Sequence, residues 1–393
     1  MPWDLVIGQD RLTEALGRAV AQERIAGAYL FYGPDGVGKR AAALAFAQAL
    51  QCEQRGRGGP KDAACGRCLA CTKVGRGLHP DLHVYLPQPN DARLDDVTER
   101  LQRLYRNPYE VVDFQRRPSL QDAGKTSSKQ VIYSADGIRA IMHDLHYVPG
   151  EGRYTVGILL DADRMRVEAA NAFLKMLEEP GEQTVLVLTA TRTDQMLPTI
   201  LSRCQRLRFD PLPAEAIEQA LAAREQVAPD RAAFVARMAD GSYAQALALT
   251  ESEELAERRQ LALDFLRKAY GLDPMTLPLQ IEQIGKLGRE PVKQLFSLML
   301  GWVRDLVLYR VAGENAPLVN VDQAEAIRSF VTRLPDARLE AMTGLIEEAA
   351  DLIEGNVHTA LVLTVLAQAL SAAMRGQDRT RLFAPLAEPA VTA

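Results

Sequence analysis

A glycine-rich segment, GPDGVGKR at residues 33–40, most constrains how this chain folds. A short apolar run at 28–32 precedes it and predicts a buried strand, and the alanine-rich run at 41–50 predicts a helix. Between a strand and a helix, such a segment binds phosphate, because glycines let backbone N–H groups approach the oxygens and the helix start adds its positive dipole end. The segment therefore predicts a nucleotide site that includes Gly33, Gly36, Gly38 and Lys39.

The residue after the lysine departs from this pattern. A phosphate-binding loop has Ser or Thr there, and the hydroxyl holds Mg²⁺. Here the position is Arg40, and a guanidinium cannot ligate a cation. We therefore predict that the loop can take ATP or ADP. The sequence argues against a bound Mg²⁺ and leaves hydrolysis open.

Strands and helices alternate after the loop, up to a boundary at Asp-Pro-Leu-Pro. Apolar runs at 154–160, 184–189 and 205–209 predict strands, and helices are expected over 136–147 and 167–179. This alternation predicts a parallel sheet that helices cover on both faces.

Asp161 follows one of these strands at the edge of the sheet where ligands gather. A carboxylate at that place holds Mg²⁺ beside the phosphate-binding loop in enzymes that transfer phosphoryl groups. An aspartate there also commonly caps a helix or a turn. Both interpretations of Asp161 stay open from the spacing alone.

Four of the five cysteines lie close together in the sequence. Their spacing, C-x12-C-x2-C-x2-C, lets four thiolates complete the tetrahedral shell of a structural Zn²⁺. The alternative is a set of buried or redox-active cysteines, which the surrounding glycines and charges disfavour. The segment 52–79 is therefore predicted to be a zinc module, and its excess of basic residues is typical of a solvated surface or, less often, of a nucleic-acid contact. The predicted ligands are Cys52, Cys65, Cys68 and Cys71.

The other segments are defined mainly by composition. The polar stretch 87–130 is expected to be a surface insertion, partly disordered, with one helix near 97–105. Residues 211–251 suit three short helices, and 252–375 suit five or six longer ones with no strand. The polar and then Pro- and Ala-rich end, 376–393, is expected to be disordered.

The overall composition excludes several classes of protein. A net charge of −5 over 393 residues argues against general coating of nucleic acid. There is no apolar run long enough for a membrane span and no secretory signal at the start. An odd number of cysteines, mostly clustered, favours metal binding in a reducing compartment over disulfides, so we expect a cytoplasmic protein.

Several motifs together resemble the clamp-loader branch of the AAA+ ATPases. The resemblance covers residues 1 to about 250 well and beyond that only the layout of helices. It rests on GQ at 8–9, CGRCLAC at 65–71, DGIR at 136–139, ANAFLKMLEEP at 170–180 and SRC at 202–204.

This resemblance implies an α/β RecA-like AAA+ domain of the P-loop NTPase type over 1–210, a helical lid over 211–251 and a helical collar over 252–375. It implies a role in a hetero-oligomeric ring with gamma/tau-type and delta-type subunits, which opens a sliding clamp and places it on primed DNA during replication. Arg203, in the SRC motif, corresponds to an arginine finger that acts on the nucleotide of the adjacent subunit, and Thr189 to a strand-end position beside the nucleotide.

Three departures separate this chain from the hydrolysing members of that family. Those members follow the lysine with Thr or Ser, keep an Asp-Glu pair and carry an arginine in the lid. This chain has Arg40, has Ala162 after Asp161, and has no arginine in the segment 241–246. We therefore expect a largely non-hydrolysing stator that supplies Arg203 in trans. The alternative is an ATP-hydrolysing, gamma/tau-like motor that uses Asp163 or another residue, and a freestanding P-loop kinase or switch is less favoured.

Overall fold

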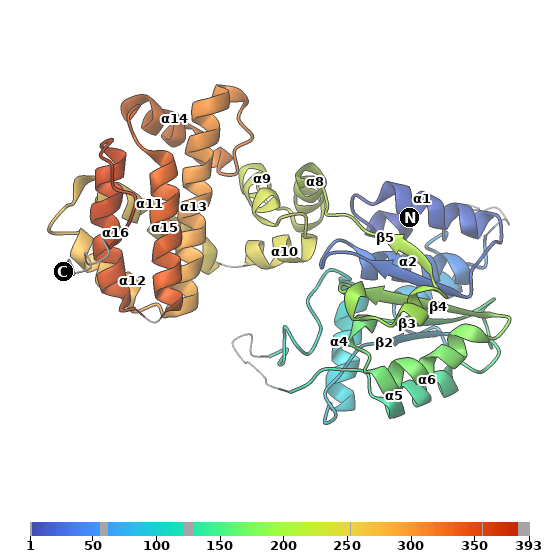
Figure 1. Ribbon diagram of the computed structural model, residues 1–393. Helices are drawn as coiled ribbons and strands as arrows, with labels where there is room; N and C mark the ends of the chain where they lie inside the picture. Colours follow the sequence, from blue (N-terminus) through green and yellow to red (C-terminus); the bar gives the residue numbers. More distant parts are fainter. Residues whose placement is uncertain (1, 56–61, 122–128, 252, 356, 384–393) are drawn as a thin grey trace, which may run out of the picture. The chain divides into compact units, whose positions relative to one another are not determined.

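The computed structural model describes residues 2–55, 62–121, 129–251, 253–355 and 357–383 (Figure 1). The chain divides into two compact units. Unit 1 comprises Met1–Gln226 with Ala239–Ala248, and unit 2 comprises Val227–Met238 with Leu249–Ala393. The boundaries of the three predicted domains remain predictions, because this division into two units does not test them.

Unit 1 contains a parallel sheet of five strands in the order β2-β3-β4-β1-β5. The predicted parallel α/β architecture is thus confirmed. Because all strands run in the same direction, the loops that follow β1, β3 and β4 emerge at one edge of the sheet. The strands are β1 (Ala28–Tyr32), β2 (Leu82–Tyr85), β3 (Thr155–Leu159), β4 (Thr184–Ala190) and β5 (Gln205–Arg208).

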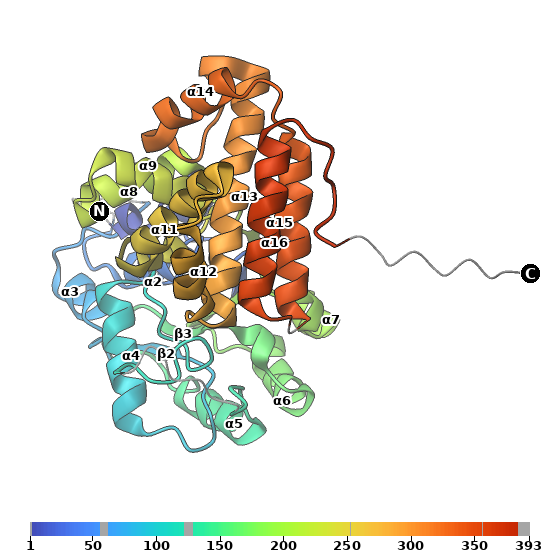
Figure 2. The same cartoon turned by 90° about the vertical axis from the view of Figure 1, so that its left-hand side faces the viewer.

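Helices cover both faces of this sheet, as Figures 1 and 2 show. Successive side chains of β1 point to opposite faces. Tyr29 and Phe31 contact Phe46 of α2, whereas Leu30 joins the apolar cluster formed with α5 and α6. The helices are α1 (Asp10–Ala21) and α2 (Lys39–Gln51) on one face, with α5 (Ala135–Asp144) and α6 (Val167–Glu178) on the other.

The polar insertion is more ordered than its composition predicts. Its helix, α4, runs from Leu94 to Arg106 and confirms the one expected near 97–105. The chain after α4 carries buried apolar side chains, among them Val112 and Phe114, so this part of the insertion is packed and not only surface. Residues 107–118 are thus ordered, and the partial disorder predicted for the insertion stays a prediction, because residues 122–128 lie outside the described residues.

Three short helices follow β5, as predicted. They are α8 (Ala214–Glu225), α9 (Pro229–Met238) and α10 (Tyr243–Glu251). The first belongs to unit 1 and the second to unit 2, and α10 begins in unit 1.

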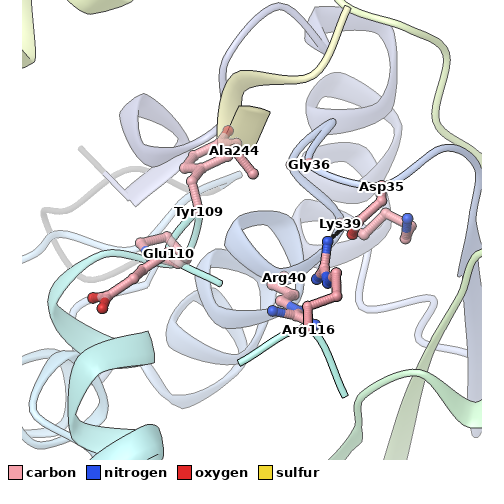
Figure 3. Close-up of a pocket in the computed structure, with 10 residues that line it drawn as sticks. Asp35, Gly36, Lys39, Arg40, Tyr109, Glu110, Arg116 and Ala244 are labelled. Carbon is pink, nitrogen blue, oxygen red and sulfur yellow. Dashed lines mark ion pairs between the residues drawn. The ribbon is translucent and has the colours of Figure 1, made fainter. Parts of the chain in front are cut away.

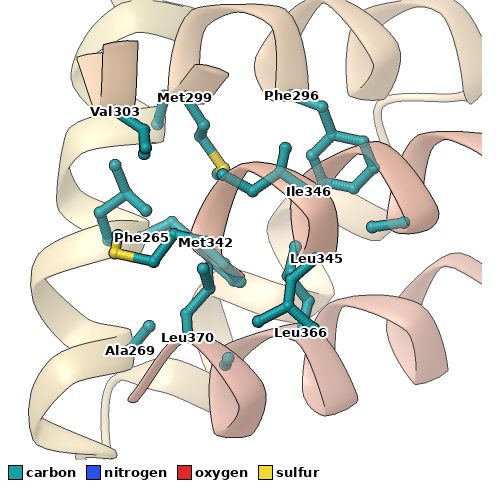
Figure 4. Close-up of a cluster of buried hydrophobic side chains, with 14 of the residues drawn as sticks. Phe265, Ala269, Phe296, Met299, Val303, Met342, Leu345, Ile346, Leu366 and Leu370 are labelled. Carbon is teal, nitrogen blue, oxygen red and sulfur yellow. The ribbon is translucent and has the colours of Figure 1, made fainter. Parts of the chain in front are cut away.

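Unit 2 is built from helices throughout its described residues, which confirms the prediction of five or six without a strand. The apolar stripe of α13, from Leu295 to Leu306, is buried. Phe265, Met299 and Met342 lie among the side chains that fill the space between the helices (Figure 4). Besides α9, the helices are α11 (Glu253–Gly271), α12 (Leu277–Gly285), α13 (Arg289–Ala312), α14 (Ala324–Arg333), α15 (Leu339–Glu354) and α16 (Thr359–Met374).

The start of the predicted disordered end packs on unit 2. Leu382 is buried, and its N–H donates to Glu348 Oε2 at 2.8 Å. Disorder is therefore a wrong prediction for this part, and residues 384–393 lie outside the described residues. Within the described parts of both units, the helices are too short or too polar to cross a membrane.

Candidate functional site

The glycine-rich loop adopts the backbone that its sequence requires. Gly36 and Gly38 have φ angles of 74° and 102°, and Gly33 has 147°. These values lie where residues with a side chain are strained. A Cβ on Gly33 would also lie 2.1 Å from the backbone oxygen of Phe209. The loop therefore connects β1 to α2 in a shape that depends on its glycines.

Lys39 is directed into the loop itself. Its Nζ donates to the backbone oxygens of Gly33 at 2.7 Å and Pro34 at 2.5 Å, and lies 3.4 Å from Thr191 Oγ1. The residue is 5% exposed, and burial lowers the pKa of its ammonium to about 8. The group that would contact outer phosphates is thus engaged by the carbonyls of its own loop.

Arg40 and Asp161 form an ion pair, with Nη2 2.9 Å from Oδ2. They meet because Arg40 lies in the first turn of α2 and Asp161 follows β3 at the same edge of the sheet. Their side chains are 10% and 12% exposed. Burial acts to raise the pKa of Asp161, but the positive charges around it, first that of Arg40, outweigh burial and lower it. The carboxylate is therefore ionised and paired inside the protein.

These residues do not fit a bound Mg²⁺. The carboxylate predicted to hold the cation accepts from Arg40, a cation with no lone pair to offer a metal. The predicted Thr189 is fully buried, and its hydroxyl accepts from the N–H of Asp161 at 2.9 Å. Asp163, which a hydrolysing alternative needs as a base, accepts from the N–H of Arg192 at 3.1 Å through Oδ2, whereas its Oδ1 is buried without a partner among the described residues. The carboxylate of Asp161 and one oxygen of Asp163 thus accept from donors of the protein itself.

The insertion contributes two side chains to the loop that the sequence did not single out. Arg116 pairs with Asp35 of the loop, and its Nε lies 2.6 Å from the buried Asp113 Oδ2. The hydroxyl of Tyr109 accepts from the N–H of Ile7 at 2.9 Å. A Cβ built on Gly38 would lie 2.9 Å from this hydroxyl, so Tyr109 covers the loop closely.

Residues at the start of α10 cover the other side of the loop. The N–H of Tyr243 donates to the backbone oxygen of Gly36 at 3.0 Å, and a Cβ on Gly36 would lie 2.1 Å from Ser242 Oγ. The rings of Tyr109 and Tyr243 meet edge to face, with centroids 4.9 Å apart. The segment 241–246, where we expect hydrolysing members of the family to have an arginine, thus packs directly on the loop.

Little space remains between these groups (Figure 3). The volume open to water centres is about 20 Å³. That is room for about one water molecule, whereas pockets for whole ligands usually measure at least about 300 Å³. The space is lined by Asp35, Gly36, Gly38, Lys39, Arg40, Pro108, Tyr109, Glu110, Arg116 and Ala244.

The four clustered cysteines converge as the spacing predicts. The Sγ atoms of Cys52, Cys65, Cys68 and Cys71 all lie within 4.8 Å of one another, and those of Cys65 and Cys71 are 3.9 Å apart. Zn–S bonds of about 2.3 Å in a tetrahedron place sulfurs roughly 3.8 Å apart. Backbone N–H groups also donate to three of the sulfurs. The donor set therefore fits a closed structural Zn²⁺ site.

Arg203 lies at the opposite edge of the sheet from the loop. It precedes β5, and β5 runs parallel to β1, whose carboxyl end leads into the loop. The five residues of β1 span roughly 16 Å from one edge of the sheet to the other. The guanidinium is partly exposed, donates to Thr199 O at 3.0 Å and pairs with Glu178 Oε1 at 2.8 Å. Arg203 therefore does not join the other predicted site residues.

Comparison with known proteins places the fold and the loop in a family. The sequence model of the family described as "DNA polymerase III, delta subunit" matches residues 8–213. The tau subunit of DNA polymerase III from Bacillus subtilis is 27% identical over 382 residues, covering 92% of this chain and 60% of that protein. The solved structure of a gamma-subunit-related protein from Thermotoga maritima is 16% identical and covers 92% of this chain and 99% of its own, with a TM-score of 0.36, too low to support an inference.

Two relatives are delta-prime subunits of DNA polymerase III. That of Bacillus subtilis is 31% identical over 251 residues, which are 64% of this chain and 62% of that protein. That of Pseudomonas aeruginosa is 28% identical over 373 residues, 93% of this chain and 95% of that protein. The chain thus spans about 60% of the length of the two relatives from Bacillus subtilis. These relatives, named as delta-prime and tau subunits, confirm the resemblance of the sequence to clamp-loader proteins, and the chain belongs to the DNA polymerase III delta-subunit family.

Proposed function

We propose that this chain is a delta-prime-like clamp-loader subunit that helps to load the sliding clamp on primed DNA without hydrolysing ATP itself. Its relatives are named as delta-prime and tau subunits of DNA polymerase III, which supports the assembly but not the division of work within it. The observation that carries the absence of hydrolysis is the Arg40–Asp161 ion pair. That pair occupies the carboxylate a hydrolysing site uses for Mg²⁺.

The charges around the loop support the same proposal. Arg40 pairs with Asp161, and Arg116 pairs with Asp35 and Asp113. Both guanidinium groups thus have carboxylate partners without any ligand, and Lys39 donates to the carbonyls of its own loop. A triphosphate without Mg²⁺ would add several negative charges to a buried place, and uncompensated buried charge is costly. Nothing in this balance calls for a bound nucleotide.

We further propose that the chemical contribution of this subunit is Arg203 acting in trans. Its place at the edge of the sheet opposite the loop is compatible with reaching a neighbouring subunit and not the chain's own loop. The charge of an arginine stabilises the transition state of phosphoryl transfer and is typically worth 10³–10⁵ in rate. Arg203 would exchange Glu178 for the neighbour's phosphate on assembly.

The remaining parts of the chain fit supporting roles. In this proposal residues 1–210 form the RecA-like AAA+ domain, 211–251 the lid and 252–375 the collar that joins gamma/tau-type and delta-type subunits in a cytoplasmic ring. Cys52, Cys65, Cys68 and Cys71 would hold one Zn²⁺, which stabilises the module 52–79 and takes no part in chemistry.

The test is ATP hydrolysis by the isolated chain and then by the chain assembled with its partner subunits. The isolated chain should show no turnover above a Lys39→Ala control. In the assembled complex, Arg203→Ala should slow hydrolysis at the neighbouring subunit's nucleotide site about 1,000-fold or more. Because other subunits still hydrolyse ATP, the total ATPase rate should fall only in part. Arg206→Ala, an exposed arginine on β5, is the matched control and should leave the rate unchanged. Turnover by the isolated chain that Lys39→Ala abolishes would instead establish the motor alternative.

A further inference from the structure

We propose that residues 107–118 of the insertion are a built-in occupant of the phosphate-binding loop that competes with nucleotide. This inference deepens the proposed function, on which it rests, because it names what keeps the loop closed in a subunit that does not hydrolyse ATP. It also assigns a role to an insertion whose composition predicts none.

Arg100 of α4 holds this segment in place. The residue is fully buried, an uncommon position for an arginine. Its Nη1 donates to the backbone oxygens of Val112 at 2.7 Å and Arg117 at 2.9 Å, and Nε donates to Asp96 at 2.9 Å. The guanidinium also stacks on the ring of Phe114, 3.8 Å from its centroid. One side chain thus ties the middle and the end of the segment to the helix.

Held in this way, the segment presents a tyrosine to the loop backbone. Tyr109 is 4% exposed and enclosed between Ile7, Gly38 and Tyr243. The N–H groups of such a loop must face the phosphate oxygens to bind them. A side chain seated against Gly38 blocks that approach by its volume. The contact is therefore steric and does not depend on charge.

The same segment presents an arginine to the acidic residue of the loop. Arg116 pairs with Asp35, and Asp113 fixes the direction of Arg116 by accepting both its backbone N–H at 2.9 Å and its Nε at 2.6 Å. A guanidinium held against the loop satisfies the loop's negative charge from within the chain. The segment thus matches the loop both in shape and in charge.

The small space beside the loop means that a nucleotide must displace the segment before it can bind. A volume of about 20 Å³ admits one water and no phosphate chain, so a nucleotide can bind only if Tyr109 and Arg116 leave. The free energy needed to displace the segment then reduces the free energy of nucleotide binding, so the apparent affinity for the nucleotide falls. Weakening the segment should therefore raise this affinity.

The experiment measures binding of a fluorescent ATP analogue to the full-length protein without Mg²⁺. Tyr109→Ala removes the steric contact, and Arg100→Met releases the segment from α4 at a distance from the loop. Each should bind the analogue at least about tenfold more tightly than the wild type, with the gain lost on adding Lys39→Ala. Hydrogen exchange of the amides at residues 36–40 should accelerate in both variants, which reports the uncovering directly.

Two substitutions serve as matched controls. Tyr109→Phe keeps the ring over the loop, and Tyr105→Ala removes a tyrosine of α4 that contacts Gly77 and not the loop. Both should bind within about twofold of the wild type. The proposal is overturned if folded Tyr109→Ala shows neither tighter binding nor faster exchange, or if the wild type binds as tightly as Tyr109→Ala. Hydrolysis in the same samples separates the two proposals, since wild-type turnover refutes the proposed function whatever the binding shows.

Discussion

Arg40 and Asp161 form a buried ion pair between the first turn of α2 and the second residue after the fully buried strand β3, although 121 positions separate them in the chain. The guanidinium is beside the carboxylate that a hydrolysing loop would use for Mg²⁺. Because the two charges satisfy each other, this corner of the sheet is complete without a ligand. The pair is therefore both the reason we expect no hydrolysis and a part of the folded core.

Removing one partner of this pair should destabilise the protein strongly. Arg40→Ala leaves the carboxylate of Asp161 buried without its cation, and such single deletions typically cost about 3–5 kcal/mol. The double variant Arg40→Ala/Asp161→Asn removes the uncompensated charge and should recover part of this loss. Urea unfolding followed by circular dichroism measures both. Arg11→Ala, an exposed arginine of α1, is the control, and an equal loss in that variant would contradict our account of the pair.

Lys39 should make stability rise with pH in the alkaline range. Its pKa is about 8 in the folded protein, because of burial, and 10.5 in the unfolded chain. Between these values the unfolded chain holds a proton that the folded protein has lost, so raising the pH favours the folded state. From pH 7.5 to 9.5 the free energy of unfolding should increase by roughly 1–2 kcal/mol more in the wild type than in Lys39→Met. Parallel curves for the two proteins would refute the lowered pKa.

Metal analysis should find about one Zn²⁺ per chain, because four thiolates complete the shell of one ion. Cys68→Ala removes a ligand and should abolish tight metal retention and lower the melting temperature. Cys204→Ala is a matched control, since Cys204 is also buried but lies outside the cluster. A folded wild-type protein that stays free of metal after zinc is supplied would remove the assignment.

Substitutions at Arg203 and at its partner Glu178 should have different effects on the ATPase rate of the assembled complex. Both side chains of the pair are partly exposed to solvent, so Glu178→Gln should change the free energy of unfolding by less than about 1 kcal/mol. If Glu178 only holds Arg203 before assembly, the assembled complex with Glu178→Gln should keep its ATPase rate within about twofold, while Arg203→Ala loses it at the facing site. A loss as large with Glu178→Gln would give the carboxylate a role of its own.

Local patterns predicted most of the fold because they depend on residues near one another in the chain. The run 28–32 alternates between two buried faces and became β1, and the apolar stripe from Leu295 to Leu306 became the inner face of α13. The insertion was predicted least well. Its buried residues follow no helical or strand period, because Arg100 organises them through backbone oxygens and not through a continuous apolar face.

The sequence by itself determined the α/β order, the glycine loop and the cysteine cluster. Each of them depends on the type and spacing of residues that are close together in the chain. Only the tertiary structure decided the state of that loop. It brought Asp161 to Arg40, and it placed Tyr109 and Arg116 against Gly38 and Asp35. These contacts depend on which strands end at the same edge of the sheet and on where α4 directs the chain after it. Sequence spacing carries no signal for such pairings, because burial and charge are satisfied there by residues that are distant in the chain.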